Sequence, residues 1–476
     1  RKFTLLWKKT RQRELRMRGF NMKAIVVGVG KTGLALIEML TNEGIDVTVI
    51  DCDKAVIDSV TDKLNVTGVE GSGASRGTLL KAGADSADVL IALTPVDEIN
   101  LLSCLQAKNL GTRHTAARLL MSDLSMEKDD LIKEYNIDYI VRPKIDVAEI
   151  IYNNVGLPGH VRLDSFFGDT IQMLSIDVIK ESPFYEKNLI ELRQELNGNF
   201  LIVAVLRNDK LFIPDGSFVC KEGDDVFLIS DQKGVASTFK KMGIIKTSAK
   251  KVLVVGGGFT GDYLTNALLK DGKDVTIVEG NINNCKKLME KYPSAKVSYG
   301  DAESIEILED EGITKKDAVI SITDRDEANL VVSMFAWASG VPSIITRIDT
   351  LAHAKMLHKV NMDITVSPSE IAANKLYRFA RNMQMADAKN DILKFYTICD
   401  SMAEIMEFDV TDKCTHLNIP FKDKAFKLKK DTLVAAIIKD SILTIPNGSS
   451  KLIAGDKVII VSASKNKIKN LNEIFK

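Results

Sequence analysis

The stretch AIVVGVGKTGLALIEMLTNEGIDVTVID, residues 24–51, decides the fold of this chain. A short apolar strand leads through a glycine-rich turn into an amphipathic helix, and a second strand then ends on an acid. The same order returns 228 residues later as VLVVGGGFTGDYLTNALLKDGKDVTIVE, residues 252–279. A repeat of this length indicates tandem duplication, so the architecture of one copy predicts that of the other.

The repeat continues through the rest of the chain. LIALTPVDEINLL at 90–102 corresponds to VISITDRDEANLV at 319–331, and FIPDG at 212–216 corresponds to TIPNG at 444–448. The first half of each copy alternates short apolar runs with stretches of helical period, which is typical of βαβ units and a parallel sheet. The second half holds strands separated by turn signals, with one short helical segment at 188–196.

We therefore predict an α/β protein with two tandem Rossmann-type doubly wound parallel-sheet domains, each followed by a small α+β (β-rich) domain. The predicted divisions are a basic N-terminal tail at 1–21, Rossmann domains at 22–150 and 246–375, and β-rich domains at 151–245 and 376–476.

The composition excludes several classes of protein. The 476 residues include 64 Lys and Arg and 64 Asp and Glu, so the chain lacks the basic excess of a nucleic-acid binder. No apolar run approaches the roughly 18 residues of a membrane helix, and we expect a cytoplasmic protein. The six cysteines form no C-x-x-C pair, which predicts reduced thiols in the core and neither a zinc site nor disulfides.

The first twenty residues stand apart, because they carry eight basic side chains against one acid, Glu14. This segment either contacts anionic lipid headgroups or is a disordered tail, with Met22 as the natural start of the protein. We favour the second interpretation.

The glycine-rich turn allows two interpretations. Gly30, Lys31 and Thr32 resemble the end of a P-loop, but that motif requires a further glycine at position 25, which is isoleucine. Position 31 is Phe259 in the second copy, whereas the three fingerprint glycines are kept. The dinucleotide fingerprint is therefore favoured, and the predicted phosphate-binding turns are Gly28, Val29, Gly30, Lys31, Thr32 and Gly33, and Gly256, Gly257, Gly258, Phe259, Thr260 and Gly261.

An acid ends the second strand of each copy, Asp51 in the first and Glu279 in the second. A carboxylate at this place accepts hydrogen bonds from the adenosine ribose and repels the 2′-phosphate of NADP. NAD or an adenine nucleotide fits this pattern, and NADP does not.

Further candidate residues follow the later strands, where ligands of open α/β sheets bind. Asp97, Glu98, Asp326 and Glu327 are predicted to cap the next helices and complement their dipoles, and also to serve the ligand site. Arg118 and Arg347 end the fifth strands, where each can pair either with a phosphate or with a surface acid. The remaining candidates are Ser72 and Gly73, Asp301 and Ala302, and Thr94 and Thr323.

A dehydrogenase is the alternative from another class of function, because the same fingerprint holds NAD for hydride transfer. Such an enzyme needs a general acid or base, but the five histidines are not repeated between the copies. The one Tyr-x-x-x-Lys pair, Tyr292 and Lys296, contains a proline, and we expect both to be surface residues. Binding fits better than catalysis.

The whole string of motifs, G-x-G-x-x-G, an acid, T-x-x-D-E-x-N, a strand-end arginine and then I-P-D/N-G, resembles the RCK (KTN) family. In its duplicated form it is similar to the regulatory subunits of Trk potassium-uptake systems. The resemblance implies binding of NAD(H), and of ATP or ADP, without catalysis. It also implies a homo-oligomer, expected to be a tetrameric ring, peripheral on the inner face of the membrane, which gates a Trk-type potassium-transporting subunit. Ser72 departs from the Asn, Asp or His common there in this family.

Overall fold

The computed structural model describes residues 22–120, 128–158, 161–166, 171–196, 200–230, 249–350, 353, 357, 364–387, 391–399, 402–440 and 442–476. The predicted basic tail at 1–21 lies outside these residues. The chain divides into two compact units. One holds the chain up to Ala148 together with Ser367–Gln384, and the other holds Glu149–Val366 and Met385–Lys476.

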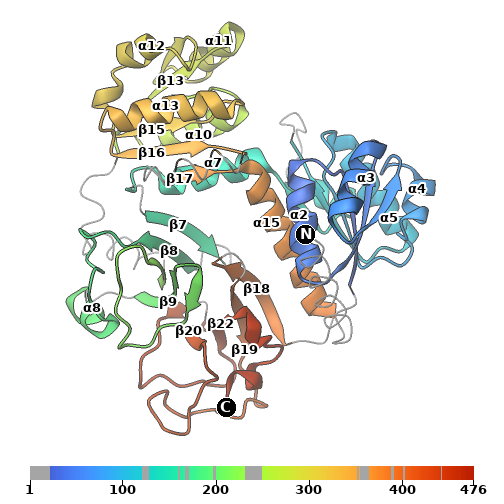
Figure 1. The fold of residues 1–476 in the computed structure, drawn as a ribbon, viewed down its shortest axis with the longest axis vertical. Coiled ribbons are helices and arrows are strands. Elements are labelled where there is room, and N and C mark those ends of the chain that lie inside the picture. The colour runs from blue at the N-terminus through green and yellow to red at the C-terminus, as the bar shows by residue number, and fades with distance from the viewer. Residues whose placement is uncertain are drawn as a thin grey trace. The chain divides into compact units, whose positions relative to one another are not determined.

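A six-stranded parallel sheet forms the first Rossmann domain (Figure 1), with the strand order β3-β2-β1-β4-β5-β6. All four residues of β4 are buried, because helices cover both faces of such a sheet. The strands are β1 (Lys23–Val27), β2 (Asp46–Asp51), β3 (Thr67–Glu70), β4 (Val89–Ala92), β5 (His114–Arg118) and β6 (Tyr139–Val141). The helices are α2 (Lys31–Asn42), α3 (Lys54–Lys63), α4 (Arg76–Lys81), α5 (Asp97–Leu110), α6 (Lys128–Glu134) and α7 (Pro143–Asn154).

The second Rossmann domain repeats this topology, with the strand order β14-β13-β12-β15-β16-β17. Its strands are β12 (Lys251–Val255), β13 (Asp274–Glu279), β14 (Lys296–Tyr299), β15 (Ala318–Ser321), β16 (Ser343–Arg347) and β17 (Ile364–Val366). Its helices are α10 (Phe259–Lys270), α11 (Ile282–Lys291), α12 (Ile305–Asp310), the 3₁₀ helix η1 (Ile313–Lys315) and α13 (Asp326–Ala338), and α15 (Pro368–Asp387) follows its last strand in the chain. In both sheets the order reverses beside the first strand, which is the place where ligands of open α/β sheets bind.

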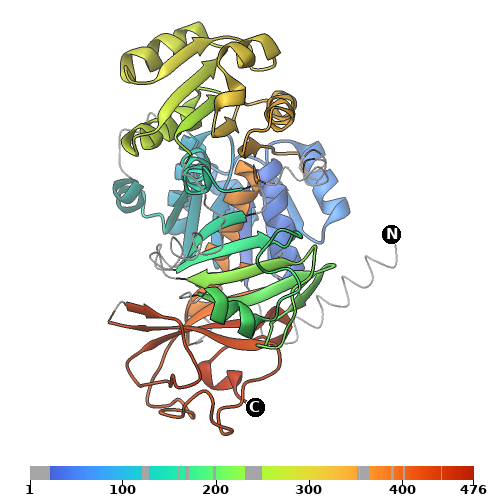
Figure 2. The same ribbon diagram turned by 90° about the vertical axis from the view of Figure 1, so that its left-hand side faces the viewer.

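A five-stranded antiparallel sheet follows each Rossmann sheet, and the two have the equivalent orders β10-β9-β11-β8-β7 and β21-β20-β22-β19-β18. They pack on each other through a shared apolar core that includes Ala204, Ile229, Ala435 and Val461 (Figures 1 and 2). The first has β7 (Val161–Phe166), β8 (Ile171–Asp177), α8 (Leu189–Leu196), β9 (Phe200–Arg207), β10 (Lys210–Phe212) and β11 (Asp225–Ser230). The second has β18 (Ile392–Ile398), β19 (Ala403–Asp409), β20 (Thr432–Lys439), β21 (Ile442–Thr444), β22 (Lys457–Ala463), η2 (Ser464–Asn466) and η3 (Leu471–Ile474).

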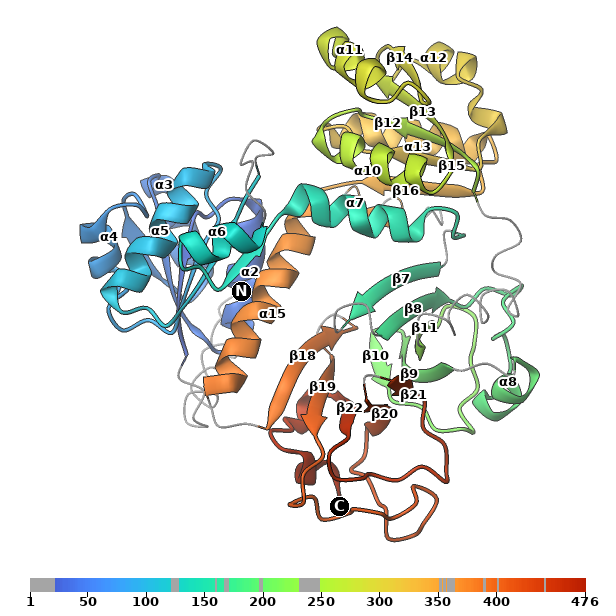
Figure 3. The same ribbon diagram turned by 180° about the vertical axis from the view of Figure 1, so that it is seen from behind.

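Helix α15 follows the last strand of the second Rossmann sheet but belongs to the core of the first Rossmann domain (Figure 3). Leu376 and Ala380 are buried there with Val26 and Leu36. Phe379 stacks on Tyr139 with ring centroids 5.2 Å apart, and the Lys375 ammonium lies 2.6 Å from the Asp146 carboxylate. The predicted divisions at residues 150 and 375 therefore fall inside helices α7 and α15.

The thiol prediction is confirmed at five of the six cysteines. Cys104, Cys220, Cys285, Cys399 and Cys414 are buried thiols, and burial raises the pKa of the Cys220 thiol to about 12. The prediction is wrong for Cys52, which is exposed because it lies in the turn that follows β2. In the described part of the chain, no helix is long and apolar enough to cross a membrane.

Candidate nucleotide-binding sites

Each glycine of the fingerprint has its own steric role. Gly28 has a φ of +94°, and a Cβ atom on it would lie 2.9 Å from the backbone nitrogen of Thr94. A Cβ atom on Gly33 would lie 2.1 Å from the carbonyl oxygen of Gly28, so the helix can approach the strand only without a side chain there. A Cβ atom on Gly30 would meet nothing within 4 Å. The space beside the backbone at Gly30 is therefore open.

The second turn has the same geometry. Gly256 has a φ of +111°, and a Cβ atom on Gly261 would lie 2.1 Å from the Gly256 carbonyl oxygen. Gly258, like Gly30, faces open space. Helices α2 and α10 start directly after these open glycines, and neither start has a side-chain cap. The first N–H groups of both helices are thus available to an anion, with the positive end of the helix dipole behind them.

The acid at the end of the second strand holds the glycine turn. Asp51 Oδ2 accepts a hydrogen bond from the backbone N–H of Val29 at 2.8 Å, and its Oδ1 accepts from Asp53 N–H at 3.0 Å. A carboxylate has about four acceptor positions, so it can still accept bonds from a ribose. This second role of the acid, as a clamp on the turn, was not foreseen from the sequence.

Glu279 repeats the arrangement with an additional partner. Its Oε2 accepts from Gly257 N–H at 2.8 Å and its Oε1 from Asn281 N–H at 2.7 Å. The Asn284 amide donates to Glu279 Oε2 at 3.0 Å and to the Gly257 carbonyl oxygen at 2.8 Å. The corresponding residue of the first copy is Val56, which has no polar side chain. The acid of the second site therefore has fewer acceptor positions left.

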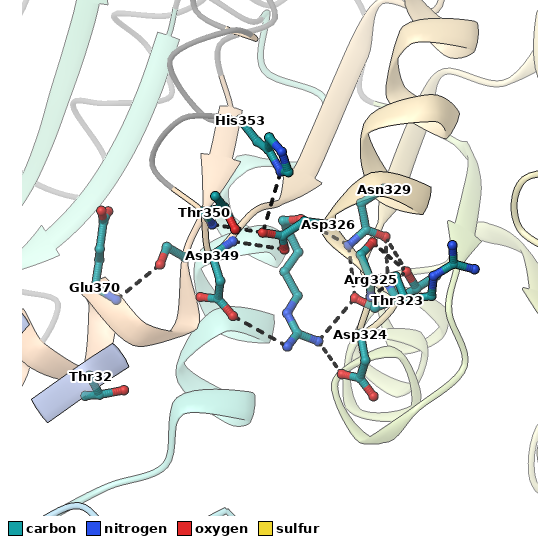
Figure 4. Close-up of polar contacts among 12 residues, drawn as sticks. Thr32, Thr323, Asp324, Arg325, Asp326, Asn329, Asp349, Thr350, His353 and Glu370 are labelled. Atoms are coloured by element: carbon teal, nitrogen blue, oxygen red, sulfur yellow. Dashed lines mark hydrogen bonds and ion pairs between the residues drawn. The ribbon is translucent and has the colours of Figure 1, made fainter. Parts of the chain in front are cut away.

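A buried asparagine joins the ends of the fourth and fifth strands. Asn100 Oδ1 accepts from both the backbone N–H and the hydroxyl of Thr94, each at 2.8 Å. Its Nδ2 donates to the carbonyl oxygens of Thr94 and Arg118, also at 2.8 Å. Asn329 makes the same four bonds, three with Thr323 (Figure 4) and one with the Arg347 carbonyl oxygen. The asparagine of the T-x-x-D-E-x-N motif thus ties the end of the fourth strand to the end of the fifth.

The aspartates of this motif do not cap their helices as predicted. The N-cap residues are Val96 and Arg325, so Asp97 and Asp326 are the first helical residues. Both Asp97 carboxylate oxygens accept from Leu120 N–H at 2.9 Å. Asp326 accepts from Asp349 and Thr350 N–H (Figure 4). The capping expectation is wrong because these carboxylates reach forward to the chain after the fifth strand. Their place in the first turn still complements the helix dipole.

The candidates after the third strands lie in tight loops. Ser72 Oγ accepts from Ala74 N–H at 3.3 Å, and Asp301 Oδ1 accepts from Glu303 N–H at 3.1 Å. A Cβ atom on Gly73 would lie 2.2 Å from the Val27 side chain, so this loop closes over the end of β1. Ala302, its counterpart, packs against the core of the second Rossmann domain.

The two strand-end arginines differ. Arg118 donates to Thr32 Oγ1 at 3.1 Å and to the carbonyl oxygens of Leu93 and Thr94 at 2.7 and 3.3 Å. Among the described residues no carboxylate lies within ion-pair distance of it, its Nε is buried without a hydrogen-bond partner, and burial lowers its pKa. Arg347, in contrast, lies 2.7 Å from Asp324 Oδ1 and 3.8 Å from Asp349 Oδ2. The salt-bridge alternative holds for Arg347 and not for Arg118.

The Tyr-x-x-x-Lys pair has separate structural partners. Tyr292 is buried, and its hydroxyl donates to the Asp262 carbonyl oxygen at 3.0 Å. The expectation of a surface tyrosine is therefore wrong, because the side chain is turned toward α10, where its hydroxyl finds an acceptor. Lys296 pairs with Glu311 at 2.6 Å. In the described part of the chain, no group of three His, Cys, Asp or Glu side chains is placed to hold a metal ion.

Comparison with known proteins agrees with this geometry. The model of the TrkA-N domain matches residues 24–143 and again 252–368, and the model of the TrkA-C domain matches 173–243. A Trk system potassium uptake protein TrkA homolog of Archaeoglobus fulgidus is 27% identical over 96% of this chain and 100% of its own length. The chain belongs to the TrkA family. The TrkA proteins of Azorhizobium caulinodans and Haemophilus influenzae are 25% and 26% identical over 96% and 95% of the chain and 99% and 98% of their own lengths.

Solved structures confirm the RCK fold predicted from the motifs. The crystal structure of the GsuK RCK domain aligns over 94% of this chain and 93% of its own, with a TM-score of 0.61 and 17% identity. A GsuK channel bound to NAD aligns over 94% of this chain and 77% of its own, with a TM-score of 0.61 and 16% identity. TrkA family members are regulatory and non-enzymatic, so the dehydrogenase alternative does not apply to this chain.

Proposed function

We propose that this chain is the nucleotide-binding regulatory subunit of a Trk-type potassium uptake system. Each of its two Rossmann domains holds NAD(H) or an adenine nucleotide, ATP or ADP, across its glycine turn. The observation that carries this proposal is the pair of open glycines, Gly30 and Gly258, each directly before an uncapped helix start.

The contacts of the ligand follow from the positions of these groups. Its phosphates lie against the first N–H groups of α2 or α10, and its adenosine ribose bonds to Asp51 or Glu279. Thr94 and Thr323 lie on the other side of the turn, since a Cβ atom on Gly28 or Gly256 would contact their backbone nitrogens. Each site thus receives an extended nucleotide at the point where the strand order reverses.

The regulatory action is a shift between two shapes of an assembly. Four chains form a ring on the cytoplasmic face of the membrane, and the ring acts on a Trk-type potassium-transporting subunit. Nucleotides move the ring between its shapes by no more than their difference in affinity for them. The relatives named as Trk system potassium uptake proteins, which match over nearly the whole chain, support this assignment.

The decisive variants are Gly30→Asp and Gly258→Asp. A Cβ atom at either position meets nothing within 4 Å, and aspartate is a favourable N-cap residue, so both variants should fold as stably as the unmodified chain. The new carboxylate lies where the ligand phosphate must lie. We expect each variant to lose one of two nucleotide sites, with affinity there falling about 100-fold, or about 2.7 kcal/mol. Isothermal titration calorimetry with NADH and ATP measures both stoichiometry and affinity.

Two controls separate charge from shape. Gly30→Asn and Gly258→Asn place a neutral side chain of the same size, and they should weaken binding less than the aspartates do. Unchanged binding in both aspartate variants would contradict the site assignment. Binding of neither nucleotide by the unmodified chain would instead indicate a nucleotide-independent scaffold. Co-purification with a Trk-type membrane subunit tests the proposed partner.

A further inference from the structure

The two nucleotide sites carry different charges at equivalent positions. Lys31 at the start of α2 corresponds to Phe259 in the second copy, and Pro95 after β4 corresponds to Asp324 after β15. Leu120 after β5 corresponds to Asp349 after β16. Across these three positions the first site has one additional cation, and the second has two additional carboxylates.

The first site holds a positive charge, Arg118, for which the described part of the chain supplies no carboxylate within ion-pair distance. Arg118 is directed toward Thr32 at the start of α2 and toward the carbonyl oxygens at the end of β4, and its Nε is buried without a partner. Burial lowers the pKa of Arg118, and among the described residues Asp97, whose carboxylate accepts a hydrogen bond from Leu120 N–H, opposes this shift. Lys31 is exposed and makes no ion pair with the described residues. A half-buried cation of this kind is stabilised when an anion binds beside it, because the attraction between the two charges offsets the cost of removing the cation from water.

In the second site, the arginines already have carboxylate partners. Arg347 is already paired with Asp324 at 2.7 Å and lies 3.8 Å from Asp349. Arg325 is paired with Glu303 at 2.8 Å. The Asp324 side chain is 94% exposed, so its carboxylate faces an incoming ligand. A further phosphate would meet this carboxylate rather than a free cation.

The position of these residues decides which part of a ligand they meet. Adenosine binds toward the second strand, at Asp51 or Glu279, and the phosphates lie at the helix start. The remainder of the ligand then extends over the fourth and fifth strands, where Arg118 or the Arg347–Asp324 pair lies. In ATP this remainder is the terminal phosphate, and in NAD it is the nicotinamide riboside, which carries no phosphate.

We infer that the two sites are specialised by charge, so that the first binds ATP or ADP and the second binds NAD(H). This inference rests on the proposed function and adds the ligand class of each site. One chain then responds both to the concentrations of ATP and ADP and to that of NAD(H). The ribose hydroxyls of the nicotinamide half can donate to the exposed Asp324 carboxylate, which a terminal phosphate cannot do.

The single-site variants make this division measurable. Gly258→Asp leaves the first site open, and we expect it to bind ATP at least tenfold more tightly than NAD⁺. Gly30→Asp leaves the second site open, and we expect the opposite preference by at least tenfold. Both titrations use the full chain at one ionic strength, because screening by salt changes phosphate contacts. The same preference in both variants would overturn the inference, while binding of neither ligand by the unmodified chain would overturn the proposed function as well.

Substitutions at Asp324 and at its counterpart Pro95 test whether this carboxylate sets the ATP preference of each site. In the Gly30→Asp chain, Asp324→Ala removes the nearer of the two carboxylates that pair with Arg347 and leaves Asp349 at 3.8 Å, so it should raise ATP affinity at the second site at least tenfold. In the Gly258→Asp chain, Pro95→Asp supplies Arg118 with a carboxylate and should lower ATP affinity at the first site by a similar factor. Pro95→Ala is the matched control and should leave the ATP affinity within threefold. ATP affinities that do not respond to either exchange would show that these charges do not select the ligand.

Discussion

Replacement of Gly33 by alanine is expected to destabilise the first Rossmann domain by about 4 kcal/mol, which is a loss that few single substitutions cause. The added Cβ atom would lie 2.1 Å from the carbonyl oxygen of Gly28, which is backbone and cannot rotate away. Helix α2 must therefore move off the sheet, and with it Leu36, Ile37 and Leu40, which are fully buried. Urea denaturation followed by circular dichroism measures the loss.

The neighbouring Gly30→Ala variant is the control for Gly33→Ala. Its Cβ atom meets nothing within 4 Å, and the poorer N-cap preference of alanine is opposed by its restriction of the unfolded chain, so stability should change by less than about 1 kcal/mol. Gly261→Ala should repeat the large loss in the second domain, because its Cβ atom would lie equally close to the Gly256 carbonyl oxygen. Equal stability of the Gly33→Ala and Gly30→Ala chains would contradict the steric role of the third glycine.

Asn100→Leu is expected to cost about 3 kcal/mol of stability in the first domain. The leucine removes four hydrogen bonds and leaves the backbone groups of Thr94 and the Arg118 carbonyl oxygen without them. Each buried polar group that loses its partner costs about 1–3 kcal/mol, and Asn100 itself is fully buried. The ends of β4 and β5 should also separate, so nucleotide affinity at the first site should fall along with the melting temperature.

Asn109→Leu provides a matched comparison, since Asn109 is on the same helix and exposed. It should change stability by no more than about 0.5 kcal/mol. Thermal unfolding of both variants by scanning calorimetry compares them directly. If Asn100→Leu unfolds at the same temperature as Asn109→Leu, then the asparagine does not hold the strand ends together.

The duplication made much of the fold predictable. Strands such as VLIA at 89–92 are short and fully apolar, and their alternation with helical periods allows few arrangements other than a doubly wound sheet. The second copy then excluded the P-loop interpretation, because Phe259 stands where Lys31 does. The steric roles of Gly28 and Gly33 likewise follow from the fingerprint, since strand, turn and helix are adjacent in the sequence.

Features that depend on contacts between distant segments were not predictable. Periodicity shows that α15 has an apolar face, but it does not show which sheet that face covers. The sequence places Arg118 and Arg347 in equivalent positions, yet their partners differ. The residue that follows the neighbouring strand is Pro95 in the first copy and Asp324 in the second, and only Asp324 can form an ion pair with the arginine. Tyr292 was expected at the surface for a similar reason, since the carbonyl group that accepts its hydroxyl is on another helix.

Helix α15 has a consequence for any attempt to divide the molecule. A half-chain that ends at the junction of the two copies lacks Ala372, Leu376 and Ala380, which complete the core around Val26 and Leu36. Its first domain would present that apolar face to water and should aggregate or recruit the corresponding helix of another molecule. The two copies are therefore not independent folding units. Limited proteolysis before residue 367 is expected to leave two fragments that remain associated through α15.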